Sequence, residues 1–155
     1  MAECLTNFMK NDIDKKFMLE ALKEARKAFA KNEVPIGAVI VKDNKVISRG
    51  YNKTEKDADS TSHAEIEAIR KAAKKFGDWR LNGCSIYVTV EPCLMCFGAI
   101  KNSRISKLVY GIKEPEFGSL KYLKKLPENL EISGGIFKEQ SRKLLQDFFK
   151  KLRKK

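Results

Sequence analysis

The only histidine of this 155-residue chain, His63, is followed two residues later by Glu65. Further along, the sequence Pro-Cys-Leu-Met-Cys places Cys93 and Cys96 three positions apart. Residues at i and i+3 of a helix share one face, about 5–6 Å apart at Cβ, so two such thiolates can hold one tetrahedral zinc ion. His63 would be the third ligand. Three protein ligands leave a fourth position for water, which indicates a catalytic zinc site and not a structural one.

The single histidine also restricts how protons can be moved. An imidazole that binds zinc cannot be a general base, so serine–histidine and cysteine–histidine schemes have no base. Proton transfer then falls to a carboxylate, and Glu65 is the nearest in sequence. Residues i and i+2 of a regular helix do not face each other, so His63 and Glu65 can converge only at an irregular helix start. We expect the helix to begin there, with Thr61 or Ser62 as its cap.

The other two cysteines and the lengths of the apolar runs indicate in which cellular compartment the protein is expected. We expect Cys4 to lie in a frayed terminus and Cys84, at the start of an apolar strand, to be a small core residue. The first residues hold no long apolar run, and no stretch approaches the roughly 18 apolar residues of a membrane span. We therefore expect a cytoplasmic protein with reduced thiols, no signal peptide and no membrane contact.

The net charge of +12 is unevenly distributed. Residues 137–155 hold eight Lys or Arg against two acidic residues, which is half of the net charge. Such an excess suits a polyanionic partner such as RNA. The alternative is a lysine-rich surface with no role in binding, and charge alone does not separate the two.

Apolar periodicity predicts the elements that must position these residues. Helices are expected at about 12–31, 63–76, 92–103 and from 137 onward, with a helical turn within 120–126, and strands at 36–41, 46–47, 84–90, 107–111 and 130–133. Residues 51–62 are expected to be a loop. Pro92 should be the first residue of the third helix, and Phe148 and Phe149 share an apolar stripe that predicts core positions. The order predicts one α/β domain, 1–155, with a mixed five-stranded sheet in an α/β/α sandwich.

A Cys-x-x-Cys pair alone would also suit a redox site, but His-x-Glu followed by Pro-Cys-x-x-Cys is typical of zinc nucleobase deaminases. The chain resembles the bacterial tRNA-specific adenosine deaminases, which convert the wobble adenosine of a tRNA anticodon to inosine. The resemblance covers about 17–153 and rests on EVPIGAVIV, GYN, HAEIEAIR, YVTVEPCLMCFGAI, SRISKLVYG, GSL and GGIFKEQSRKLLQDFF. The middle motifs are shared with guanine and cytosine deaminases, whereas the ending looks more like the tRNA enzymes.

The resemblance implies a cytidine-deaminase-like fold and a homodimer that acts on a tRNA anticodon stem-loop, with no other protein partner. It also implies one Zn²⁺ per subunit on His63, Cys93 and Cys96, and a zinc-activated water with Glu65 as proton shuttle. The substrate contacts that it suggests are Asn52, Val34, Ile36, Gly37, the backbone of Ala64, the carbonyl of Glu91, and Arg104. Asn52 could instead serve the turn after the hairpin, and Arg104 could cap the helix that ends near Ser103.

Two departures from the family bear on the substrate. The family often has Asp-Pro-Thr-Ala before His-Ala-Glu, where this chain has Asp-Ser-Thr-Ser, and the loop at 111–119 looks shorter than usual. A deaminase of free guanine or cytosine is therefore an alternative, although it has no need of a basic C-terminal helix. An alternative of another class is a non-catalytic, zinc-stabilised RNA-binding module. Glu65 argues against that module, because a structural zinc needs no proton shuttle.

Overall fold

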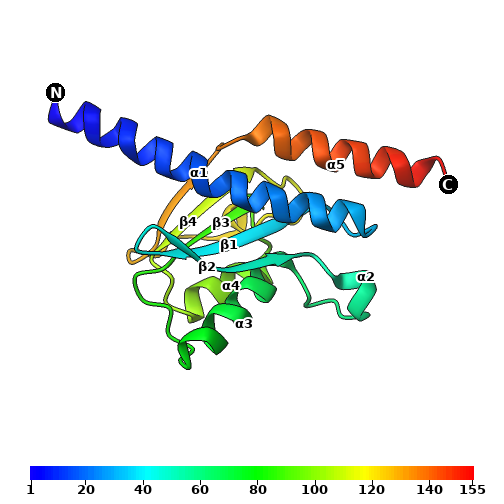
Figure 1. The fold of residues 1–155 in the computed structure, drawn as a ribbon, viewed down its shortest axis with the longest axis horizontal. Helices are drawn as coiled ribbons and strands as arrows, with labels where there is room; N and C mark the ends of the chain where they lie inside the picture. Colours follow the sequence, from blue (N-terminus) through cyan, green and yellow to red (C-terminus); the bar gives the residue numbers. More distant parts are fainter.

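The computed structural model describes residues 1–155 and shows a layered α/β domain (Figure 1). Its elements are, in chain order, α1 (Ala2–Ala30), β1 (Gly37–Lys42), β2 (Lys45–Tyr51), α2 (Thr54–Asp57), α3 (Ala64–Phe76), β3 (Ser85–Val90), α4 (Leu94–Asn102), β4 (Lys107–Ile112), the 3-10 helix η1 (Leu120–Tyr122), β5 (Glu131–Gly134) and α5 (Lys138–Arg153). The expected order of helices and strands is confirmed. The short helix α2 is an addition, because the sequence predicts only a loop at 51–62.

The five strands form one mixed sheet in the order β2-β1-β3-β4-β5. β1 is antiparallel to both β2 and β3, whereas β3, β4 and β5 are parallel. Asp43 and Asn44 join β1 to β2 with φ values of 51° and 57°. Positive φ at both positions is typical of a two-residue type I′ hairpin turn. The predicted hairpin and five-stranded sheet are therefore confirmed.

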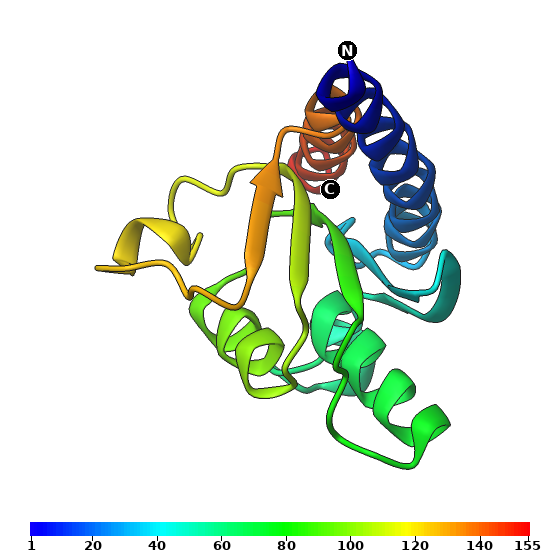
Figure 2. The same cartoon turned by 90° about the vertical axis from the view of Figure 1, so that its left-hand side faces the viewer.

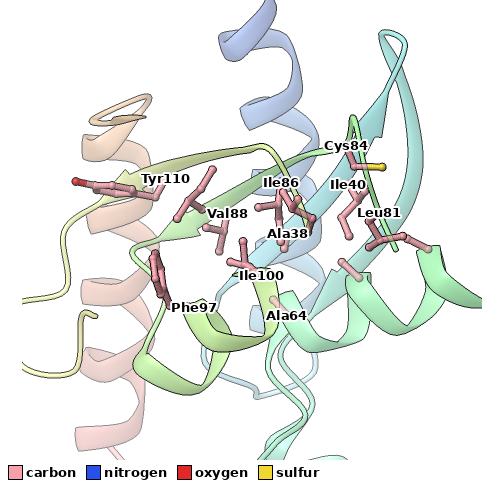
Figure 3. Close-up of a cluster of buried hydrophobic side chains, with 14 of the residues drawn as sticks. Ala38, Ile40, Ala64, Leu81, Cys84, Ile86, Val88, Phe97, Ile100 and Tyr110 are labelled. Atoms are coloured by element: carbon pink, nitrogen blue, oxygen red, sulfur yellow. The ribbon is translucent and has the colours of Figure 1, made fainter. Parts of the chain in front are cut away.

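Helices cover both faces of the sheet (Figure 2). On β3, Tyr87 packs with α1, whereas its neighbours Ile86 and Val88 belong to the core cluster on the side of α3 and α4 (Figure 3). Successive residues of a strand face opposite sides, so a strand buried on both faces is apolar throughout. The mostly apolar segment Ser85–Val90 accordingly forms the strand in the middle of the sheet.

Two helix starts differ from the prediction. α1 begins at Ala2 and not near Asp12, because residues 2–11 contain no glycine or proline to interrupt a helix. α4 begins at Leu94, with Cys93 as its N-cap, so Pro92 precedes the helix instead of opening it. None of the helices combines the length and the apolar character that a bilayer span requires.

At Gly37, the backbone of β1 lies directly against the backbone of α1. A Cβ at this position would lie 2.1 Å from the carbonyl oxygen of Ala21 and 2.4 Å from the amide nitrogen of Ala25. Because both are backbone atoms, the helix would have to move. We expect Gly37→Ala to lower the free energy of unfolding by about 3 kcal/mol or more, measured by urea denaturation.

The matched control is Gly98→Ala within α4, where an added Cβ would meet no atom of the same chain within 4 Å. Alanine favours a helix over glycine by about 0.5–1 kcal/mol, so this variant should be slightly more stable than the wild type. Equal stability of the Gly37→Ala variant and the wild type would contradict the packing argument.

Candidate active site

Three potential metal ligands meet where α3 and α4 begin. His63 is the N-cap of α3, Cys93 is the N-cap of α4, and Cys96 lies in the first turn of α4. Nδ1 of His63 lies 3.7 Å from Sγ of Cys93 and 3.5 Å from Sγ of Cys96, and all three ligand atoms lie within 4.8 Å of one another. Nitrogen and sulfur ligands at about 2.1 and 2.3 Å from a tetrahedral zinc ion are about 3.6 Å apart. The donor set and its spacing therefore fit such an ion, with Nδ1 as the imidazole ligand.

The start of α3 explains how Glu65 reaches the same site. His63 has extended dihedral angles, φ −77° and ψ 156°, so helical spacing does not separate its side chain from that of Glu65. The structure therefore has the irregular helix start that the spacing of His63 and Glu65 requires. The expected cap was wrong, because no side chain caps α3 and the hydroxyls of Thr61 and Ser62 donate to Asp59 instead.

The carboxyl group of Glu65 is buried next to this cluster. Only 4% of the residue is exposed, and burial raises the pKa of Glu65 to about 7, because a low-dielectric environment disfavours the ionised form. A carboxyl group with a pKa near neutrality can both accept and donate a proton at physiological pH. The position and environment of Glu65 therefore suit proton transfer.

The two cysteines of the cluster differ in protonation. The pKa of Cys93 is lowered to about 4, first because the Cys96 thiol donates a hydrogen bond to its sulfur and then because His63 does so. The pKa of Cys96 is raised, because its thiol proton takes part in the hydrogen bond to Cys93 and because the Cys96 thiol is buried. The pair thus shares one proton, which a bound metal ion would displace. Cys4, exposed on α1, and Cys84, buried in the core, are not part of the cluster.

The ligand cluster opens into a cavity of about 540 Å³. Cavities of roughly 300–1,000 Å³ are the usual size for small-molecule sites, so a nucleoside would fit. Of the expected substrate contacts, the ones that line this cavity are Val34, Ile36, Asn52, Ala64 and Glu91.

The side chain of Asn52 is held in a defined orientation. Its Oδ1 accepts a hydrogen bond of 2.6 Å from the hydroxyl of Thr54, and both residues line the cavity. The carbonyl oxygen is thereby engaged, which leaves the amide NH₂ to donate to a ligand. This arrangement allows a base contact and, at the same time, ties Asn52 to the turn after the hairpin.

The other two expected contacts lie outside the cavity. Gly37 packs against α1, and its N–H donates to the hydroxyl of Thr89 over 3.2 Å. Arg104 lines a separate cavity together with Lys101, and its guanidinium lies 5.2 Å from the centre of the Trp79 ring. The structure therefore does not bring Gly37 or Arg104 to the cavity that contains His63 and Cys93.

The cavity also contains side chains that the sequence analysis missed. Phe149 was expected in the core, but it is 44% exposed and lines the cavity with Leu145, whereas Phe148 is buried at 3% exposure. Consecutive residues of a helix point roughly 100° apart, so one apolar stripe cannot tell which phenylalanine faces the core. Glu114 and Phe117 line the cavity as well, from a loop whose sequence shows no comparable signal.

The sequence matches a family model of MafB19-like deaminases over residues 11–153. The tRNA-specific adenosine deaminase of Bacillus subtilis (strain 168) is 42% identical over 148 residues, which is 92% of each chain. That of Rickettsia bellii (strain RML369-C) is 46% identical over 144 residues, covering 88% of this chain and 99% of the relative. The chain belongs to the tRNA-specific adenosine deaminase family.

Solved structures agree with this family assignment. One similar structure comes from a study of A-to-I editing by tRNA:A34 deaminases at the wobble position. It matches this chain with a TM-score of 0.79 and 40% identity, over 84% of this chain and 99% of the other. Guanine deaminase from Bacillus subtilis matches with a TM-score of 0.63 and 36% identity, over 72% and 76%. The expected cytidine-deaminase-like fold is confirmed, and of these two structures the one from the study of tRNA deaminases has the higher sequence identity to this chain.

Proposed function

We propose that this protein deaminates the wobble adenosine in a tRNA anticodon loop to inosine. The observation that carries the proposal is the convergence of His63, Cys93, Cys96 and Glu65 at one cavity, in a chain whose relatives are named for this class of substrate. We regard residues 1–155 as one zinc-dependent deaminase domain that acts in the cytoplasm, where tRNA is found and thiols stay reduced.

We infer that one zinc ion per subunit is bound by Nδ1 of His63 and by the two cysteine sulfurs. Thiolate and imidazole ligands at tetrahedral spacing suit zinc among the common metal ions. Bound zinc would polarise a water molecule and so make it nucleophilic near neutral pH. The backbone N–H of Cys96, in the first turn of α4, favours the thiolate form of Cys93.

Glu65 performs the proton transfers in this scheme. When water attacks C6 of adenine, Glu65 takes its proton and delivers it to N1 as the C6–O bond forms. Glu65 then moves the remaining hydroxyl proton to the amino group, and the C6–N bond breaks to release ammonia. Its buried position beside the cavity suits Glu65 to act as base and acid in turn.

The walls of the cavity suit an unpaired base. The target base must leave any helical stack before it can enter such a site. The NH₂ group of Asn52 is available to donate to a ring nitrogen, and Val34 and Phe149 offer apolar surface to the base. We therefore assign base recognition to these three residues, with backbone contacts from Ala64 and Glu91.

We also propose that the protein is a homodimer, as its family resemblance implies. Exposed apolar side chains on and beside α4 support a second copy, because such patches are unfavourable in water. They are Leu94, Met95, Tyr122 and Leu126.

The decisive experiment presents both classes of substrate. The protein is incubated with an anticodon stem-loop that has adenosine at the wobble position and, separately, with free guanine, cytosine and adenine. Inosine in the RNA with all free bases unchanged is the expected result. Turnover of guanine or cytosine with no change in the RNA would show that the free-base alternative is correct. The experiment therefore also tests whether the short loop at 111–119 changes the choice of substrate.

Binding of the stem-loop should weaken steeply as salt is raised. In a plot of the logarithm of the binding constant against the logarithm of salt concentration, the slope becomes more negative by about 0.7–0.9 for each phosphate that the protein neutralises. We expect Lys150→Gln and Lys154→Gln, on the basic end of α5, to make this slope shallower. Lys45→Gln, on the exposed end of β2, is the control and should leave it unchanged. A binding constant of the wild type that does not respond to salt would rule out an electrostatic contribution.

A further inference from the structure

Two glutamates beside the cavity are buried, although acidic side chains are usually exposed. Glu33 is 1% exposed and Glu91 is 7% exposed. A buried carboxylate is costly unless hydrogen bonds replace its hydration. Each of these carboxylates accepts backbone N–H groups with both oxygens, and in each case the donors belong to a segment that lines the cavity.

Glu33 anchors the rim that carries Asn52. Its Oε1 accepts the N–H of Lys56 over 2.7 Å, and its Oε2 accepts the N–H of Glu55 over 3.2 Å. Both donors lie in the first turn of α2, where N–H groups have no partner within the helix and no side chain of the N-cap supplies one. Glu33 itself does not line the cavity, so its effect on the site must pass through this rim.

Glu91 anchors a second rim, the loop at 113–120. Its Oε2 accepts the N–H of Glu114 over 3.1 Å, and its Oε1 accepts the N–H of Leu120 over 2.9 Å. A Cβ on Gly118 would lie 2.7 Å from the Glu91 carboxylate, so glycine is required for the loop to lie this close. Gly118 also forms a bridge to Cys93, which ties the loop to the metal ligand.

We propose that Glu33 and Glu91 are positioning residues that fix the two rims of the cavity and so determine how well the RNA loop fits. The inference rests on the proposed function. The reacting groups, His63, Glu65 and the two cysteines, come from the starts of α3 and α4, and the only tie from a rim to them is the backbone bridge between Gly118 and Cys93. Loss of an anchor should therefore weaken substrate binding more than it slows the chemical step.

The test replaces each anchor with its amide. In Glu33→Gln or Glu91→Gln, an NH₂ group replaces one accepting oxygen and faces a backbone donor, so at least one hydrogen bond is lost. We expect KM for the anticodon stem-loop to rise about tenfold and kcat to change less than about threefold, with unchanged zinc content. Glu24→Gln is the control, since Glu24 is 2% exposed, pairs with Lys27 on α1 and does not line the cavity. Its KM should equal that of the wild type.

Amide hydrogen exchange tests the anchoring without any substrate. Glu33→Gln should speed exchange at its two partners, Glu55 and Lys56, by about tenfold and leave the partners of Glu91 unchanged, and Glu91→Gln should do the reverse. Unchanged exchange at the rims would overturn the inference, and so would a lower melting temperature with KM unchanged. If the wild type forms no inosine in RNA, the proposed function fails, and the exchange result alone then supports or overturns the anchoring.

Discussion

Glu65→Gln should lower kcat for inosine formation by about 10³-fold, within the range of about 10²–10⁴ that general acid–base catalysis supplies. Glutamine has the same shape as the buried glutamate, so packing around it should be preserved, but an amide cannot accept the proton of water. Single-turnover assays on the stem-loop would measure the rate, and elemental analysis the zinc content. We expect the variant to keep about one zinc ion per chain.

The control for this change is Glu67→Gln, two residues further along α3. Glu67 is ion-paired with Lys53 at 3.1 Å and does not line the cavity, so kcat should stay within about twofold of the wild type. If Glu65→Gln turned over at the rate of the Glu67→Gln control, Glu65 would not be the proton shuttle.

Cys93→Ala should remove the metal and much of the protein's thermal stability. Two ligands bind zinc far more weakly than three, and metal bound only by the folded state stabilises that state. Zinc at about 100 times its dissociation constant contributes about 2.7 kcal/mol, so its loss should lower the melting temperature by about 5–11 °C. Calorimetry and metal analysis of the purified variant measure both effects.

Two comparisons isolate the metal's contribution. Cys84→Ala removes a buried thiol outside the ligand cluster, so it should retain zinc even if the core packs less well. The wild type stripped with a chelator should melt close to the Cys93→Ala variant, because both lack the same ion. A Cys93→Ala variant with a full complement of zinc would show that these three side chains do not form the metal site.

The convergence of His63, Glu65, Cys93 and Cys96 could be predicted because metal-assisted chemistry admits few residue types. One histidine and one Cys-x-x-Cys pair leave little choice of ligands for a soft divalent metal, and the spacing of His63 and Glu65 requires an irregular helix start. The layered fold was equally predictable, because periodicity of 2 and of 3.6 residues records which face of each element is buried. These features depend on short stretches of chain, each of which can be interpreted separately.

Local patterns could not predict the shape of the cavity, because it is assembled from segments that are distant in sequence. The position of Phe149 depends on how α5 packs against α1, β3 and β4, and that of Glu114 depends on the hydrogen bonds between the loop at 113–120 and Glu91. An acidic side chain such as Glu33 is expected on the surface, and it is buried here only because another segment supplies its hydrogen-bond donors. The sequence by itself thus determined which atoms could bind a metal and move a proton, whereas the tertiary structure decided which further side chains line the cavity, because those side chains come from segments distant in sequence.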